Sequence, residues 1–448
     1  MLRALFAVLV VYTVYALHFP LETGIPSVNV TNLLFLVILV LIASRHEVGL
    51  VPAPAYLKMP LLLYFCVVTL AFVNAQMNSP RVPLDDFSYL KNAIFYPLFY
   101  FLALRCRLGL KQTRQMIILI LVVAAVASVQ AIRQGLDYGI GNFNETHRAS
   151  GPFGVDFHMA NRAGVYYAMF VPLFAAVALA FRGQRLWRLT AISGVALTGF
   201  AVMVTYSRQS YGIALLGLSL VFLRRSFLLS LALFGSMLVL VNYLPDSVTE
   251  RVAETEQRGA HGNVEVDVST ASRWEIWQGG MQMFADHPFG VGHGRFEDNI
   301  GRYVPRFAHY DAHNFYVLTL CECGALGAVV LLWLVLRIFT FSWWLKRRAP
   351  SGDSEAQGLA LGFSAMVLCM ALGNLYGSPF SEGSVMGDFW ILCGLLERYM
   401  ALKNAAATNE PVTSSSPIVP MAERFPLAAR AANRLPMPPR ISSRSHER

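Results

Sequence analysis

The sequence predicts an all-α integral membrane protein. Hydrophobic residues make up 55% of its 448 residues and charged residues only 14%, whereas soluble domains carry about 25% charged residues. The mean hydropathy is +0.49. Apolar runs that approach the length needed to cross a hydrocarbon layer of roughly 30 Å recur through most of the chain. A single polytopic bundle is therefore favoured over two or three soluble domains.

Twelve apolar runs predict about twelve transmembrane helices. No small-residue cleavage site follows the first run, and further runs do, so we expect that run to be retained rather than removed as a signal peptide. A long polar loop, residues 244–312, precedes the tenth span. The approximate spans are 2–18, 30–44, 57–75, 92–105, 115–132, 161–181, 187–205, 209–223, 226–243, 313–336, 357–374 and 383–401.

Lysine and arginine occur in every second connection between these spans, for example in 105–114, 182–188 and 337–348. Basic connections face the cytoplasm, so we expect both termini to be cytoplasmic and the loop 244–312 to face the opposite side. Residues 1–401 would form the membrane domain. Residues 402–448 are rich in Pro, Ala, Ser and Arg without an apolar period, which predicts a disordered cytoplasmic tail.

The net charge of +9 does not indicate nucleic-acid binding. Most Lys and Arg residues either separate the apolar runs, as membrane topology requires, or lie in the tail. The six cysteines lie in or beside apolar segments, show no CxxC spacing and are absent from the long polar loop. Neither a disulfide framework nor a zinc site is expected.

Two neighbouring stretches carry a recognisable pattern. Residues 273–294 read RWEIWQGGMQMFADHPFGVGHG, and residues 312–327 read AHNFYVLTLCECGALG. Together they resemble the O-antigen ligase family of bacterial inner-membrane proteins, in which an Arg–Trp–His-Pro–Gly-x-Gly pattern precedes His-Asn and Glu-x-Gly at the start of a membrane helix. Residues 150–154, 161–163 and 206–208 also resemble family positions, more loosely. The likeness extends over about residues 1–400 and excludes the tail.

The resemblance implies a reaction and a location. Family members transfer a glycan from undecaprenyl pyrophosphate to an acceptor hydroxyl at the periplasmic face of the inner membrane. Some relatives instead polymerise glycan repeats or glycosylate proteins. The resemblance therefore implies a particular donor but leaves the acceptor open. The acceptor could be a lipid A-core sugar, a growing polysaccharide or a protein hydroxyl.

Arginine suits the pyrophosphate because its planar, permanently charged guanidinium grips phosphate oxygens with paired hydrogen bonds. Residues 272–275 read as a capping box, which would place Arg273 at a helix N-terminus. That helix would carry an apolar, Trp-rich face suited to the membrane surface. Arg208 lies between two spans on the side where few basic residues are expected, and by resemblance it would be the second pyrophosphate ligand. Arg162 and Lys91 are weaker candidates for this anionic site.

His313 begins the tenth predicted span, with Asp311 as a possible N-cap. A neutral histidine accepts a proton near pH 7, and the surrounding sequence predicts that His313 is the catalytic base rather than a structural interfacial residue. Asn314 and Tyr316 beside it are weaker site candidates. The other histidines of this region, such as His287 and His293, lie beside proline and glycine and indicate turns.

Glu322 and Asp388 are carboxylates inside predicted spans, where an unpaired charge is costly. Glu322 follows His313 by nine residues, or two and a half helical turns, so it would lie on roughly the opposite side of the helix. A pairing role is favoured for Glu322 over that of the base, although it remains the next candidate. Asp388 is interpreted as structural.

The sequence thus predicts a metal-independent membrane glycosyltransferase that needs no cofactor. Asp85-Asp86 is the only pair of adjacent aspartates, and the first outer loop offers only Glu22, which disfavours a metal site. A polysaccharide polymerase with a second lipid-linked glycan as acceptor is the nearest alternative. A lipid-glycan transporter or flippase is disfavoured because no internal repeat is visible and the polar candidates gather toward one side.

Overall fold

The computed structural model describes most of the chain. The described residues are 1–19, 28–44, 53–78, 83–139, 147–154, 159–181, 183–228, 230–232, 235, 256–258, 264–266 and 268–409. The predicted all-α class is confirmed for this part of the chain. Its only strands are β1 (Glu256–Arg258) and β2 (Val264–Val266), which form one short antiparallel pair within the long polar loop.

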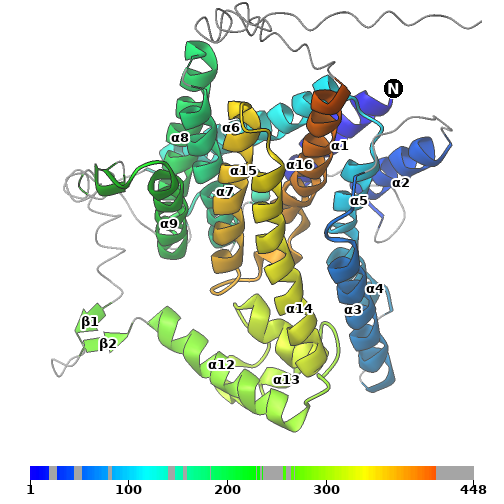
Figure 1. Cartoon of the computed structure of the whole chain (residues 1–448). Coiled ribbons are helices and arrows are strands. Elements are labelled where there is room, and N and C mark those ends of the chain that lie inside the picture. Colours follow the sequence, from blue (N-terminus) through cyan, green and yellow to red (C-terminus); the bar gives the residue numbers. More distant parts are fainter. Residues whose placement is uncertain are drawn as a thin grey trace, which may run out of the picture. The chain divides into compact units, whose positions relative to one another are not determined.

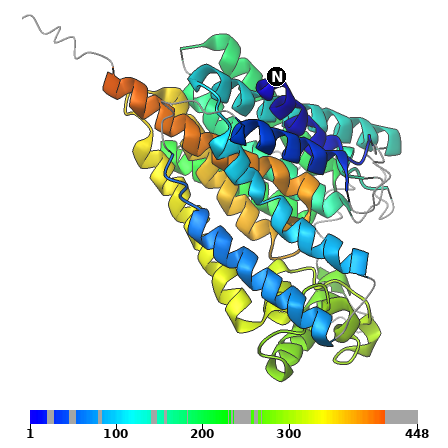
Figure 2. The same cartoon turned by 90° about the vertical axis from the view of Figure 1, so that its right-hand side faces the viewer.

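The helices run along a bundle, and residues 268–312 lie at one end of it (Figures 1 and 2). Every predicted span except the ninth overlaps a described helix, whereas most of 226–243 lies outside the described residues. The helices are α1 (Leu2–Tyr15), α2 (Val30–Ala43), α3 (Lys58–Asn78), α4 (Pro83–Phe95), α5 (Leu98–Arg105), α6 (Leu110–Tyr138), α7 (Met159–Ala180), α8 (Arg185–Val204), α9 (Arg208–Arg225), α12 (Val268–Asp286), α13 (Phe296–Ile300), α14 (Phe315–Arg348), α15 (Ser354–Gly373) and α16 (Gly383–Asn409).

Within the described residues, six helices are long and apolar enough to cross a membrane: α3, α6, α7, α8, α14 and α15. Two further apolar helices, α1 and α2, have 14 residues each, or about 21 Å at 1.5 Å per residue. The structure therefore supports a multi-pass membrane protein. The count of twelve spans stays a prediction.

Helix α7 is the most enclosed of the six, with 89% of its most apolar window buried. Small residues let α15 approach it closely: an added Cβ at Gly358 would lie 2.5 Å from Ala180, and one at Gly362 would lie 2.8 Å from Leu173. Close backbone approach of this kind increases the van der Waals contact that holds membrane helices together.

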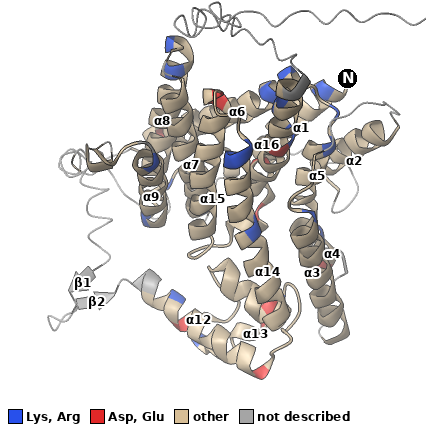
Figure 3. Cartoon of the chain, in the orientation of Figure 1, with Lys and Arg blue, Asp and Glu red and all other residues tan. Residues whose placement is uncertain are grey.

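The basic connections predicted to share one side meet at one end of the bundle, here called the basic end. Arg114 at the start of α6 pairs with Glu355 at the start of α15, with 2.6 Å between Nε and Oε1. The Arg114 guanidinium also lies 5.4 Å from the ring centre of Trp187 in the first turn of α8. The first turn of α8 and the neighbourhood of the N-terminus carry Lys and Arg (Figure 3).

The remaining connections meet at the opposite end, here called the site end. Ala149 donates its backbone N–H to Val204 at the end of α8, and Gln209 at the start of α9 donates to the carbonyl of Gly373 at the end of α15. Phe315 at the start of α14 donates its backbone N–H to Asn374. The connections between helices thus form two sets, one at each end of the bundle. This arrangement agrees with the prediction that successive connections alternate between the two sides of the membrane.

Three local predictions are corrected by the helix bounds. The predicted span 92–105 is divided between α4 and α5 near Pro97, because proline has no N–H for the helical ladder. Helix α12 begins at Val268, so Ser272 is not its N-cap and Arg273 lies inside the helix. The N-cap of α14 is Asn314 rather than Asp311. Helix α16 continues past residue 401 to Asn409, and residues 410–448 lie outside the described residues, so the membrane domain 1–401 and the disordered tail 402–448 stay predictions.

Candidate functional site

The two sequence motifs dock onto each other at the site end. Val291 donates its backbone N–H to the carbonyl of Cys321, and Gly292 donates to the carbonyl of Glu322, at 2.9 and 3.0 Å. Ala325 donates in return to the carbonyl of Pro288 at 3.0 Å. These bonds are possible because α14 is interrupted at Gly324, where φ is 67° and ψ is −168°. The predicted uninterrupted tenth span is thus two helical segments joined at a docking point.

Glycine is required on both sides of this docking point. Gly290 has φ 88°, and an added Cβ would lie 2.3 Å from the carbonyl oxygen of Glu322. A Cβ on Gly324 would lie 2.5 Å from the carbonyl oxygen of Pro288. Only a residue without a side chain permits both the positive φ and the close backbone approach. Gly290 of the Gly-x-Gly pattern and Gly324 of the Glu-x-Gly pattern are therefore both required by the same close backbone contact between the two motifs.

The docking point places His293 against Glu322. The His293 Nδ1 atom lies 3.1 Å from a Glu322 oxygen, and the two side chains are 15% and 8% exposed. The other Glu322 oxygen accepts a hydrogen bond from the backbone N–H of Phe296 at 3.3 Å. Burial by itself lowers the pKa of His293, but the hydrogen bond and charge of Glu322 outweigh it, so the pKa of His293 is raised. Glu322 thus pairs, as its depth in the span led us to expect.

A buried ion pair holds α4 to the same loop. Arg295 is fully buried, and its two terminal nitrogens lie 2.6 and 2.5 Å from the two carboxylate oxygens of Asp86. Gln76 in α3 donates a further hydrogen bond to Asp86 at 2.5 Å. Paired bonds of this geometry fix orientation as well as distance. The loop that carries His293 is therefore tied to α3, α4 and α14.

His313 lies in the turn that precedes α14 and has an unusual backbone. Its φ is 47°, a left-handed conformation that non-glycine residues adopt rarely and that is enriched at functional sites. The side chain is 40% exposed, and its Nδ1 lies 3.6 Å from a carboxylate oxygen of Asp311. Asn314 accepts hydrogen bonds from the backbone N–H groups of Tyr316 and Val317, so a capped helix begins directly after the histidine.

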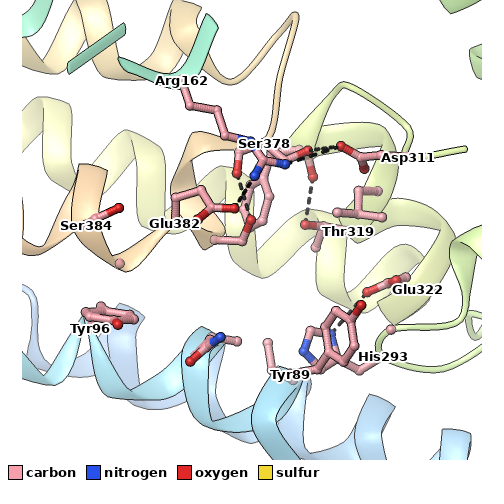
Figure 4. Close-up of a pocket in the computed structure, with 18 of the residues that line it drawn as sticks. Tyr89, Tyr96, Arg162, His293, Asp311, Thr319, Glu322, Ser378, Glu382 and Ser384 are labelled. Atoms are coloured by element: carbon pink, nitrogen blue, oxygen red, sulfur yellow. Dashed lines mark hydrogen bonds and ion pairs between the residues drawn. The ribbon is translucent and has the colours of Figure 1, made fainter. Parts of the chain in front are cut away.

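Asp311 also belongs to a second group of polar side chains (Figure 4). One terminal nitrogen of Arg162 lies 4.0 Å from Asp311, and the other contacts Glu382. Ser378 donates a 3.5 Å hydrogen bond to Asp311. Arg162 therefore connects α7, the turn before α14 and the segment before α16. Two carboxylates, those of Asp311 and Glu382, therefore engage Arg162.

Arg208 and Arg273 lie beside the connection that follows α15. Arg208 is the first residue of α9, and its neighbour Gln209 donates to Gly373 at 2.8 Å. The Arg273 guanidinium lies 5.9 Å from the ring centre of Tyr376, three residues further along the same connection. Phe315, two residues after His313, donates to the carbonyls of Asn374 and Gly377. Arg273 and near neighbours of Arg208 and His313 thus contact residues 372–377.

The other predicted residues have plainer environments. Tyr316 donates its hydroxyl to the carbonyl of Ala371 at 2.9 Å, which ties α14 to α15. Lys91 lies in α4, half-buried. Asp388 is buried in α16, and the hydroxyl of Tyr166 lies 3.5 Å from one of its oxygens.

A cavity of about 920 Å³ opens among these elements, within the usual size range of small-ligand sites. Of the predicted site residues, Arg162 and Glu322 line it, together with His293 and Asp311, whereas Arg208, Arg273 and His313 do not. Its lining residues are Tyr12, Thr13, Ala16, Leu17, Val28, Asn29, Tyr64, Val68, Tyr89, Asn92, Ala93, Tyr96, Arg162, His293, Gly294, Glu297, Asp311, Phe315, Leu318, Thr319, Glu322, Cys323, Ser378, Ser381, Glu382, Gly383 and Ser384.

Comparison with known families decides the relationship. Residues 193–332 match the family model described as O-antigen ligase. The matched segment is similar to an O-antigen ligase domain and covers less than half of the chain. The resemblance read from residues 273–294 and 312–327 is confirmed, and both stretches lie inside the match. A search of curated proteins returned no match to the chain.

The O-antigen ligase domain implies glycan transfer of the ligase or polymerase type, with lipid-linked glycan substrates at a bilayer. The matched segment contains Arg208, Arg273, His313 and Glu322. Arg162 lies outside it and reaches the site through Asp311. Among the described residues, no group of three or more His, Cys, Asp or Glu side chains is placed to hold a metal ion.

His293 and Asp311 are the residues of the O-antigen ligase domain whose roles sequence reasoning missed. His293 was interpreted as a turn residue, which it is, since Gly292 and Gly294 beside it have φ of 105° and 75°. The turn also aims its side chain at Glu322. Two features of the sequence could have indicated this pair. A carboxylate inside a span, here Glu322, requires a partner, and the adjoining motif contains a histidine, His293.

Proposed function

We propose that the protein transfers a glycan from an undecaprenyl-pyrophosphate carrier to an acceptor hydroxyl at the site end of the bundle. The observation that carries the proposal is the placement of His313. It is half-exposed, held in a left-handed turn before a capped helix, and faced by a carboxylate that lines a cavity. A base so placed is accessible to substrate and restricted in orientation.

In the proposed step, neutral His313 accepts the proton of the acceptor hydroxyl while the hydroxyl oxygen forms a bond to the sugar C1. The C1–O bond to the pyrophosphate breaks, and its electron pair leaves with the phosphate oxygen. Asp311 orients the imidazole through Nδ1 and stabilises the imidazolium that forms. Attack opposite the leaving group inverts the anomeric centre.

Arg208 and Arg273 are proposed to bind the pyrophosphate, whose charge increases as the C1–O bond breaks. Arg208 is the first residue of α9, so the positive end of the helix dipole would add to the charge of its guanidinium. Arg273 is supported by the Tyr376 ring, and the neighbouring Trp274 is 52% exposed, which suits a helix against the membrane surface. No metal or cofactor is required because the donor is already activated.

The proposed membrane is the bacterial inner membrane, with the basic end in the cytoplasm and the site end in the periplasm. The basic connections gathered at one end support this orientation. Reporter fusions after residue 409 test it. Activity of a periplasmic reporter at that position would reverse the whole topology.

Reconstitution tests the reaction. Purified full-length protein in liposomes would receive a synthetic undecaprenyl-pyrophosphate oligosaccharide together with lipid A-core. We expect glycan to move to lipid A-core and undecaprenyl pyrophosphate to be released in equal amount, with no effect of a chelator. A product made without lipid A-core, with two repeats on one carrier, would assign polymerisation in place of ligation. Absence of both products would refute the proposed function.

A further inference from the structure

The cavity beside Asp311 differs in charge from the surroundings expected of a pyrophosphate site. Its described lining contains four carboxylates, those of Glu297, Asp311, Glu322 and Glu382, against the two basic groups of Arg162 and His293. Arg162 contacts Asp311 and Glu382, and His293 contacts Glu322. The described lining therefore carries a net negative charge even when His293 is protonated. Such a lining repels a pyrophosphate.

The uncharged part of the lining suits a sugar ring. Tyr12, Tyr64, Tyr89 and Tyr96 contribute rings whose faces are apolar and whose hydroxyls are polar. Asn29 and Asn92 add amide groups that both donate and accept hydrogen bonds. In Figure 4, Tyr89 lies beside His293 on one side of the pocket, and Arg162, Ser378 and Glu382 lie on the other side. The ring of Tyr96 packs against Gly383. A pyranose between such walls has apolar contact for its C–H face and polar partners for its hydroxyls.

We propose that this cavity is the subsite for the acceptor glycan and that it selects a neutral sugar or an amino sugar over an acidic one. The proposal rests on the function proposed above, because it takes Arg208 and Arg273, which do not line the cavity, as the donor-phosphate ligands. Asp311 lines the cavity and faces His313. The acceptor hydroxyl would then approach the base from the cavity, and the leaving pyrophosphate would lie outside it.

Direct binding tests the subsite without any transfer. Full-length protein in lipid nanodiscs would be mixed with methyl β-glucoside, methyl β-glucosaminide or methyl β-glucuronide, and saturation-transfer NMR would report binding. We expect the first two glycosides to bind and the glucuronide to bind at least about tenfold more weakly. Equal binding of the glucuronide would overturn the proposed selectivity.

Two variants locate the binding. Tyr89→Ala and Asn92→Ala should each weaken glucoside binding about tenfold, the usual effect of one lost ring contact or hydrogen bond in a closed site. Tyr138→Ala and Asn78→Ala are the matched controls, because these residues lie at the same end and outside the cavity. Unchanged binding in both cavity variants would overturn the proposal. Glu297→Gln should improve glucuronide binding, and no improvement would count against the charge argument.

A competition distinguishes acceptor from donor. Undecaprenyl pyrophosphate without a sugar should leave glucoside binding unchanged, and displacement would show that the cavity holds the donor phosphate. In the transfer assay, Tyr89→Ala should raise the KM for lipid A-core about tenfold and leave the donor KM unchanged. The reverse split would overturn the acceptor assignment. Protein that binds glucoside but transfers nothing would refute the proposed function, and normal acceptor KM in both cavity variants would refute the subsite.

Discussion

Two histidine–carboxylate pairs lie at the site end, and they differ in distance, exposure and backbone conformation. His313 and Asp311 are 3.6 Å apart, and the histidine is 40% exposed. His293 and Glu322 are 3.1 Å apart and are 15% and 8% exposed. The first pair lies in a turn with a left-handed histidine, whereas the second pair closes the junction of two motifs.

We propose that the same two residue types serve different purposes in the two pairs, according to how exposed the histidine is. A base needs an accessible nitrogen and a partner that orients the ring without holding it in a tight pair. A buried pair needs complete hydrogen bonding, because a carboxylate left without its partner is costly. Substitutions in the two pairs should therefore change different measurements, and four experiments test this separation.

The largest expected effect is on stability. Glu322→Ala removes the partner of His293 and the acceptor of the Phe296 N–H, and loss of one member of a buried pair costs about 3 to 5 kcal/mol. Thermal denaturation in detergent should show a marked fall in Tm. Glu275→Ala, on the exposed face of α12, is the control and should leave Tm unchanged. If Glu322→Ala had the same Tm as the wild type, the proposal that the His293–Glu322 pair stabilises the fold would be wrong.

The next effect is on turnover. His313→Gln keeps hydrogen-bonding capacity but cannot accept a proton near neutral pH. Transfer in liposomes should fall about a hundredfold or more, with Tm and donor binding unchanged. His309→Gln is a close control, since His309 is exposed and also has a positive φ of 65°. Near-normal transfer by His313→Gln would falsify its role as the base.

The arginines should affect donor use rather than stability. Arg208→Lys and Arg273→Lys keep the charge and lose the planar fork. A lost charged hydrogen bond is worth about 1.5 to 3 kcal/mol, or roughly ten- to a hundredfold in binding. The measurement is the donor KM at saturating acceptor, with Arg302→Lys as the exposed control. Full activity of both lysine variants would indicate generic surface charge.

The smallest expected effect is a change in thermal stability with pH, caused by the buried pair of His293 and Glu322. The pKa of His293 is raised in the folded protein because Glu322 outweighs burial. A raised histidine pKa stabilises the fold below the unfolded pKa of about 6.5, and that contribution is lost as pH rises through the folded pKa. Tm should therefore fall with rising pH more steeply in the wild type than in His293→Gln. Parallel curves would contradict the raised pKa.

The sequence by itself predicted the membrane class, the alternation of basic connections and the similarity to O-antigen ligases. These properties are local: hydropathy over about 20 residues sets the preference for a bilayer, and charge beside a span sets orientation. The two motifs also identified Arg273 and His313 as candidates, and the looser likeness at residues 206–208 identified Arg208, without any knowledge of their neighbours. The prediction of a helix N-terminus at Ser272 was wrong. The capping pattern at 272–275 is present in the sequence, but the helix already begins at Val268.

Only the tertiary structure decided which polar residues meet. The pairing of His293 with Glu322 depends on a break in α14 at Gly324 and a backbone contact with residues 288–292, neither of which has a periodic signal. The link from Asp311 to Arg162 spans about 150 residues of chain. The cavity likewise combines segments from α1 to α16, because a cavity is produced by how helices pack and not by the residues of any one of them.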